Sequence, residues 1–145
     1  MARLVVVIGP TGVGKTAHAI TLAQQYGCPI VSADSRQIYR DLPIGTAAPT
    51  AQEQALVEHH MVGFLGLHDT YSAGQFARDC EKLLKQLFAQ HDTVVLVGGS
   101  MMYVDALCNG LDEMPSVPDS IRQSVREQYQ LWGMTWLQEQ VKQFD

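Results

Sequence analysis

Eight consecutive residues near the start of the chain have types and a spacing suited to binding phosphate groups. They fit the pattern GxxxxGK[ST] and run Gly9-Pro10-Thr11-Gly12-Val13-Gly14-Lys15-Thr16. In such a loop the backbone amides, the N-terminus of the following helix and the Lys15 ammonium surround a diphosphate or triphosphate, while the Thr16 hydroxyl can bind Mg²⁺. The motif requires a strand before it and a helix after it, and the sequence has both patterns. It therefore predicts a phosphate-binding loop with a magnesium ion.

Asp34 is the best candidate for a carboxylate near this loop. It follows a short apolar run, residues 30–32, and open α/β sheets bind their ligands at the carboxyl ends of strands. The alternative is that Asp34 and Ser35 only cap a helix or shape a turn. A nucleotide hydrolase would normally place a metal-binding Asp after a second apolar strand. Residues 94–97 lead instead into Gly98-Gly99-Ser100, which argues against a motor or switch ATPase.

These residues need strands that end beside one another and helices that begin there. The expected strands are residues 4–8, 30–32 and 93–97, and the expected helices are residues 15–26, 72 to about 90, and 100–110. The first run is continuous and β-branched, so we expect a central strand covered on both faces. Residues 45–50 and 59–69 lack periodicity and predict loops with at most one helical turn between them. The fold class is α/β, with a P-loop NTPase-like parallel sheet flanked by helices.

The pattern changes after a proline-containing segment, residues 114–118. Apolar residues at helical spacing predict one helix from Ile121 to Trp132 and a second that begins at the capping pair Thr135 and Gln138. We therefore divide the chain into a core, residues 1–114, and the beginning of a helical insertion domain, residues 115–145. The second pattern runs to Asp145 without a capping residue or a return strand, so we expect a fragment of a longer protein.

The composition limits the class of protein. With 46% hydrophobic and 17% charged residues, the chain belongs with soluble globular proteins. A net charge of −5 argues against nucleic-acid binding by bulk electrostatics. The three cysteines form no CxxC pair, which indicates neither a disulfide framework nor a zinc site. Since no apolar run suits a signal peptide or a membrane span, we expect a cytoplasmic protein with no membrane contact.

Several motifs, in order along the chain, resemble those of the tRNA dimethylallyltransferase family. They are GPTGVGKT, SADSRQIYRDLPIGTAAPT, the pair His59-His60, Tyr71-Ser72 before a helix, and VLVGGSMMYVDAL. The resemblance implies that the loop binds the diphosphate of dimethylallyl diphosphate rather than ATP. It also implies transfer of the prenyl group to the exocyclic amine of an adenosine next to the anticodon of tRNA. Because family members continue into a longer helical part, we expect these residues alone to bind the diphosphate weakly and to prenylate tRNA poorly or not at all.

The same resemblance implies roles for single residues. Lys15 stabilises the leaving diphosphate together with Mg²⁺, Asp34 is the general base, and Ser100 lies near the reacting groups where the family usually has Thr. The residues implied to contact tRNA are Asp34, Ser35, Arg36, Gln37, Ser100 and Arg122. For Arg122, a solvated surface charge is an equally good interpretation.

Two positions depart from the family pattern. Ala48 stands where the family has Lys, so a contact with substrate is expected to be weaker, and Gly63 replaces the Asp that follows the His pair. His59 and His60 could bind a metal, but no third ligand has a suitable spacing. We therefore favour a structural or hydrogen-bonding role for both.

Two other functions are left open. A P-loop small-molecule or nucleoside kinase would share the sheet and Lys15, but it should carry an Arg-rich lid, and the arginines here are not clustered. A non-enzymatic RNA-binding module would keep its function after Asp34→Ala, whereas the transferase would lose prenyl transfer. We expect a monomer.

Overall fold

The computed structural model describes residues 2–111 and 117–144. The chain divides into two compact units, Met1–Leu111 and Asp112–Asp145. The boundary expected at residue 114 lies outside the described residues. Each unit is described below by itself.

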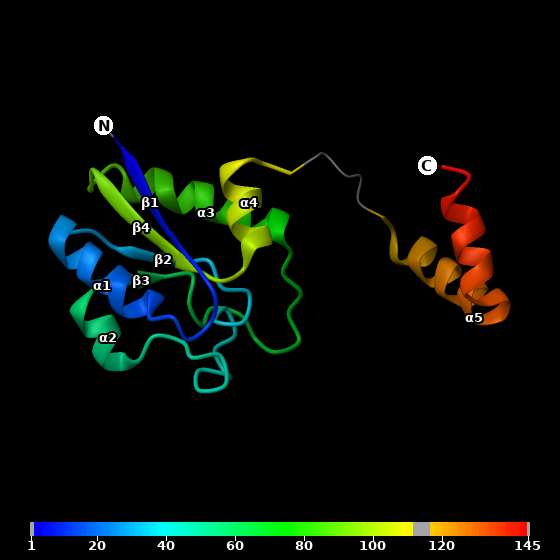
Figure 1. The fold of residues 1–145 in the computed structure, drawn as a ribbon, viewed down its shortest axis with the longest axis horizontal. Helices are drawn as coiled ribbons and strands as arrows, with labels where there is room; N and C mark the ends of the chain where they lie inside the picture. The colour runs from blue at the N-terminus through cyan, green and yellow to red at the C-terminus, as the bar shows by residue number, and fades with distance from the viewer. Residues whose placement is uncertain (1, 112–116, 145) are drawn as a thin grey trace. The chain divides into compact units, whose positions relative to one another are not determined.

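The first unit is built on a parallel sheet of four strands (Figure 1). In spatial order they are β1 (Arg3–Ile8), β4 (Thr93–Gly98), β2 (Ile30–Ser32) and β3 (His59–His60). β4 pairs with β1 from Arg3↔Thr93 to Ile8↔Gly98, and with β2 from Ile30↔Val95 to Ser32↔Val97. All four strands therefore point their carboxyl ends the same way, and the segments that follow β1, β2 and β4 meet at one edge of the sheet.

Helices cover both faces of this sheet (Figure 1). α1 (Lys15–Tyr26) buries Ala19, Ile20 and Ala23 against one face, where Val95 of β4 lies. α3 (Ala73–Leu87) and α4 (Met101–Cys108) form the other core with the β4 residues Val94 and Leu96. Alternate residues of β4 thus face opposite cores, as the pleat of a strand requires. The prediction of an α/β sheet flanked by helices is confirmed.

The expectation that residues 4–8 form a central strand is wrong. β1 lies at the edge of the described sheet, and its residues Val6 and Ile8 are 37% and 49% exposed. β4 takes the central place and is almost fully buried. An apolar β-branched run indicates that both faces of a strand are apolar, but it does not encode which strand becomes its neighbour.

A short helix lies between the two expected loops, where a helical turn was allowed, and a short strand lies inside the second expected loop. α2 (Ala51–Leu56) begins with a capping box, in which Thr50 accepts from the backbone of Glu53 and the Glu53 side chain accepts from the backbone of Thr50. β3 has only two residues, too few to show any periodicity in the sequence. At the start of α3, Ser72 accepts from the Gln75 backbone, while the Gln75 side chain donates to Asp79 rather than to the backbone of Ser72.

The second unit contains α5 (Asp119–Val141), which is two helices meeting at Gly133. Gly133 has φ 71° and ψ −166°, a backbone conformation that is not helical. The break lies two residues before Thr135, close to the predicted start of the second helix. The apolar residues that predicted the first helix, Ile121, Val125, Tyr129 and Trp132, are all exposed. Within the described ranges, no helix is long and apolar enough to cross a bilayer.

Thiol labelling of the native chain should modify Cys108 and spare the other two cysteines. Cys108 is exposed, whereas Cys28 and Cys80 are buried. Burial raises the pKa of both buried thiols, and that of Cys80 to about 12, while the thiolate is the reactive form. Mass spectrometry should count one label per native chain at about pH 8 and one on each cysteine after unfolding. Fast native labelling of Cys80 would contradict the packing of α3.

Candidate active site

The phosphate-binding loop joins β1 to α1 and leaves the start of α1 open. Gly14 precedes the helix with φ 88° and ψ 17°, a left-handed conformation that suits glycine, and no side chain caps the helix. The first backbone amides of α1 are therefore available to an anion. Lys15 Nζ donates to the Pro10 carbonyl at 2.7 Å, which holds the ammonium over the loop. One short segment thus offers both amides and a cation to a phosphate.

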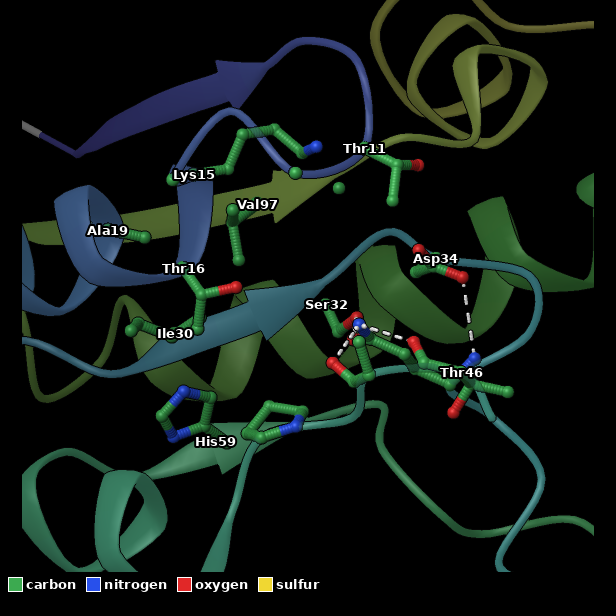
Figure 2. A pocket seen from close by; sticks show the side chains of 16 residues that line it. Thr11, Lys15, Thr16, Ala19, Ile30, Ser32, Asp34, Thr46, His59 and Val97 are labelled. Carbon is green, nitrogen blue, oxygen red and sulfur yellow. Dashed lines mark hydrogen bonds between the residues drawn. The ribbon is translucent and has the colours of Figure 1, made fainter. Parts of the chain in front are cut away.

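A cavity of about 340 Å³ lies between this loop and the ends of the strands. Figure 2 shows Lys15 and Asp34 on different sides of it. The lining residues are Thr11, Gly12, Gly14, Lys15, Thr16, Ala19, Ile30, Ser32, Asp34, Gln37, Thr46, Ala47, Pro49, His59, Val97 and Gly98. The sheet therefore brings the phosphate-binding loop and the candidate base to one cavity of a size suited to a small ligand.

Asp34 shapes the turn after β2 and also borders the cavity. Its Oδ1 accepts from the backbone N–H of Arg36 at 2.9 Å and of Gln37 at 3.4 Å. The turn-shaping role considered as an alternative is therefore present. Both hydrogen bonds use Oδ1, however, and the side chain still lines the cavity. The turn thus holds the carboxylate at the cavity edge.

Gly98 and Ser100 hold the segment after β4 against the turn after β2. A Cβ on Gly98 would lie 2.1 Å from the Ala33 carbonyl oxygen, a backbone atom, so only glycine fits this close approach. Ser100 Oγ accepts from the Ser35 N–H at 2.8 Å and donates to Ser35 Oγ at 3.0 Å. Ser100 does not line the cavity. Its hydroxyl instead steadies the turn that carries Asp34.

The structure brings together most of the residues named from the sequence. Those that line the cavity are Thr11, Gly12, Gly14, Lys15, Thr16, Asp34 and Gln37. Gly9, Pro10 and Val13 complete the loop around it. Ser35 and Arg36 are exposed on the turn beside Asp34, while Arg122 is exposed on α5, in the other unit.

Sequence reasoning missed the part of the cavity that Thr46, Ala47 and Pro49 form. The available signal was the segment GTAAP, which belongs to the family resemblance and in which Ala48 replaces Lys. Ala48 itself does not line the cavity, and its N–H donates to the Pro43 carbonyl at 3.0 Å. Gly63, the other departure, donates its N–H to the Gln37 carbonyl at 2.8 Å. Neither Ala48 nor Gly63 is among the residues that line the cavity.

His59 also lines the cavity, from β3. Its Nδ1 lies 2.8 Å from the Val57 carbonyl oxygen, which can only accept, so Nδ1 carries the proton. Its Nε2 is buried without a hydrogen-bond partner among the described residues. Over the same ranges, no three His, Cys, Asp or Glu side chains gather in a way that could hold a metal ion.

A family model described as IPP transferase matches this chain from residue 37 to residue 145. The chain belongs to the IPP transferase family. The sequence resemblance to transferases that prenylate tRNA is thereby confirmed.

The chain has curated relatives that are named tRNA dimethylallyltransferases. It is 48% identical, over all 145 residues, to tRNA dimethylallyltransferase 2 of Parabacteroides distasonis and covers 48% of that protein. It is 49% identical, over 142 residues, to tRNA dimethylallyltransferase 1 of Phocaeicola vulgatus and covers 47% of it. The chain thus spans about half the length of the curated relatives it matches. None of these names favours the kinase alternative.

Solved structures support the same family and fold. The tRNA isopentenylpyrophosphate transferase of Bacillus halodurans matches the whole chain with a TM-score of 0.75 and 28% identity, over 48% of its own length. A eukaryotic dimethylallyltransferase acting on tRNA matches 81% of the chain with a TM-score of 0.74 and 26% identity, over 30% of its own length. The P-loop fold of the first unit is therefore that of the family.

Proposed function

We propose that the protein to which these residues belong transfers a dimethylallyl group from dimethylallyl diphosphate to the exocyclic amine of an adenosine next to the anticodon of tRNA. The observation that carries this proposal is the single cavity lined by both the phosphate-binding loop and Asp34. Dimethylallyl diphosphate bound by its phosphates to the loop would place its allylic carbon in the same cavity that the Asp34 carboxylate borders. The names of the relatives supply the substrate class.

The proposed reaction breaks the allylic C–O bond and forms a bond from that carbon to the adenosine amine. The electron pair of the C–O bond leaves with the diphosphate, whose negative charge therefore grows in the transition state. Amides at the start of α1 and the Lys15 ammonium are already directed at this position, so they stabilise the transition state more than the ground state. Asp34 accepts the amine proton as the new bond forms.

Magnesium is part of the proposal as a cofactor. Mg²⁺ usually keeps several waters and binds through one or two protein groups together with substrate phosphates, so it needs no cluster of carboxylates. The Thr16 hydroxyl lines the cavity beside Lys15 and would be its protein ligand. The ion would supply further positive charge to the leaving diphosphate.

Contacts with tRNA are proposed for the exposed side of the turn after β2. Ser35 and Arg36 are exposed there, next to Asp34. A base that reacts inside a cavity must leave its stack, as bases read by RNA-binding proteins commonly do. We propose that these two residues meet the extruded adenosine or its neighbours. Arg122 as a further tRNA contact, a cytoplasmic location and a monomeric state stay predictions.

Calorimetric titration of the 145-residue chain with dimethylallyl diphosphate in Mg²⁺ tests the first step. Lys15→Ala should weaken binding by about 10- to 100-fold, because a charge-assisted hydrogen bond to an anion is lost. Lys85→Ala, at an exposed position on α3, is the matched control and should bind like the unchanged chain. ATP is titrated in parallel. Tight Lys15-dependent binding of ATP, with none of the prenyl diphosphate, would overturn the proposal in favour of a kinase.

A further inference from the structure

One wall of the cavity is a short segment, residues Thr46 to Pro49, which we call the strap. It lies between β2 and α2 and contributes Thr46, Ala47 and Pro49 to the cavity lining. Its backbone N–H groups are used within the neighbouring residues: Thr46 donates to Leu42, Ala47 to Ile44 and Ala48 to Pro43, at 3.0 to 3.3 Å. The strap is thus a folded turn, without free amides that could bind a phosphate.

The side chain of Gln37 joins the strap to the end of β2. Its Oε1 accepts from the buried Ser32 hydroxyl at 3.0 Å. Its Nε2 donates to the carbonyl oxygen of Ala47 at 3.0 Å and to that of Thr46 at 3.4 Å. Figure 2 shows these hydrogen bonds crossing the space between Ser32 and Thr46. Both ends of the amide are therefore occupied by the protein itself.

Gln37 is connected to the candidate base as well as to the strap. Its backbone N–H donates to Asp34 Oδ1 at 3.4 Å, and its carbonyl accepts from Gly63 at 2.8 Å. One residue thus links the turn that carries Asp34 to the wall that faces the phosphate-binding loop. A change in this side chain would alter the width of the cavity on the side where Asp34 lies.

The strap needs such a partner for two physical reasons. Ala47 has φ 50°, a left-handed conformation that a residue with a Cβ keeps only where its surroundings hold it there. In addition, carbonyl oxygens directed into a cavity that binds an anion would repel the ligand. The Gln37 amide meets both requirements. It holds the left-handed turn in place, and its N–H groups bind the carbonyl oxygens of Thr46 and Ala47.

We propose that Gln37 is a positioning residue, which clamps the strap as the far wall of the cavity and thereby sets its affinity for a prenyl diphosphate, rather than a residue that reads the tRNA base. This inference rests on the proposed function for the identity of the ligand. It assigns Gln37 a different task from its exposed neighbours Ser35 and Arg36. A second amide supports the strap from the other side, since Gln54 Nε2 donates to the carbonyl of the buried Pro49 at 2.8 Å.

The test combines hydrogen exchange at the strap with calorimetric titration of the 145-residue chain by dimethylallyl diphosphate in Mg²⁺. Gln37→Ala removes the clamp, and Gln37→Glu keeps the size of the side chain but removes its N–H donors. Each should speed exchange of the Ala47 and Ala48 amides and weaken binding about tenfold or more, as expected for the loss of two hydrogen bonds. Gln52→Ala, at an exposed position on α2, is the control and should change neither.

The outcomes separate the two proposals. If the unchanged chain shows no Lys15-dependent binding, the proposed function fails, while exchange at the strap still reports on the clamp. If the unchanged chain binds dimethylallyl diphosphate and both Gln37 variants bind it as tightly as the unchanged chain does, the clamp does not set the affinity and the inference is overturned. The inference is also overturned if hydrogen exchange of the Ala47 and Ala48 amides is unaltered in both variants. Should Gln37→Ala fail to fold, as judged by loss of Cys80 protection from labelling, the isosteric Gln37→Glu decides.

Discussion

Asp34→Asn should lower the rate of prenyl transfer by about 100- to 10,000-fold, the usual contribution of a general base. Asparagine keeps an oxygen that can accept from Arg36 and Gln37, so the turn after β2 should survive. What the substitution removes is the capacity to take a proton from the adenosine amine. The turn-shaping role and the catalytic role of Asp34 are therefore separated by a single change.

This rate is best measured in a chimera in which residues 1–145 replace the matching half of the Parabacteroides distasonis relative, because the chain covers 48% of that protein. Incorporation of the prenyl group into tRNA is followed by mass spectrometry, and tRNA affinity is measured separately. Asp41→Asn, at an exposed position seven residues further on, is the matched control. Normal transfer by the Asp34→Asn protein would remove Asp34 from the mechanism.

Gly98→Ala should destabilise the first unit by more than about 3 kcal/mol, which is beyond the usual effect of a point substitution. The added Cβ would lie 2.1 Å from the Ala33 carbonyl oxygen, 2.4 Å from its carbon and 2.9 Å from its Cα. All three are backbone atoms, so no side-chain rotation relieves the clash. β4 and the segment after β2 would have to separate, which would break hydrogen bonds at the centre of the sheet.

Urea unfolding followed by circular dichroism measures this effect. Gly45→Ala is the matched control, since a Cβ there meets nothing within 4 Å and the residue has no positive φ. Its midpoint should stay close to that of the unchanged chain, within the small range typical of surface substitutions. Equal midpoints for the two variants would mean that the close approach at Gly98 can relax at little cost.

Local patterns in the sequence predicted the elements that carry the site. The apolar runs of β2 and β4, the helical spacing of α1 and the glycine-rich loop before it all agree with the structure. These features depend on neighbours along the chain. The edge position of β1 was not predictable in this way, because strand order depends on pairing between segments far apart in sequence.

The cavity was predictable only on one side. The loop and Asp34 carry residue types with a chemical signature, whereas the strap presents Ala47 and Pro49, which have none. The contact between Gln37 and Ala47 was also not predictable, because the sequence does not indicate whether a side-chain amide will bind a ligand or a backbone carbonyl ten residues away. Ser100 was expected near the reacting groups, whereas its hydroxyl contacts Ser35, a residue 65 positions away in the sequence.

The place of β4 has a consequence for a chain that emerges from the ribosome one residue at a time. β4 lies between β1 and β2 although it follows both in the sequence. A nascent chain that ends before residue 93 holds β1 and β2 without β4, the strand that lies between them, so the phosphate-binding loop and Asp34 have no fixed separation. Non-local pairing of this kind forms late, after the cost of closing long loops has been met. The cavity therefore forms only when β4 joins the sheet, and no N-terminal piece that ends before residue 93 contains it.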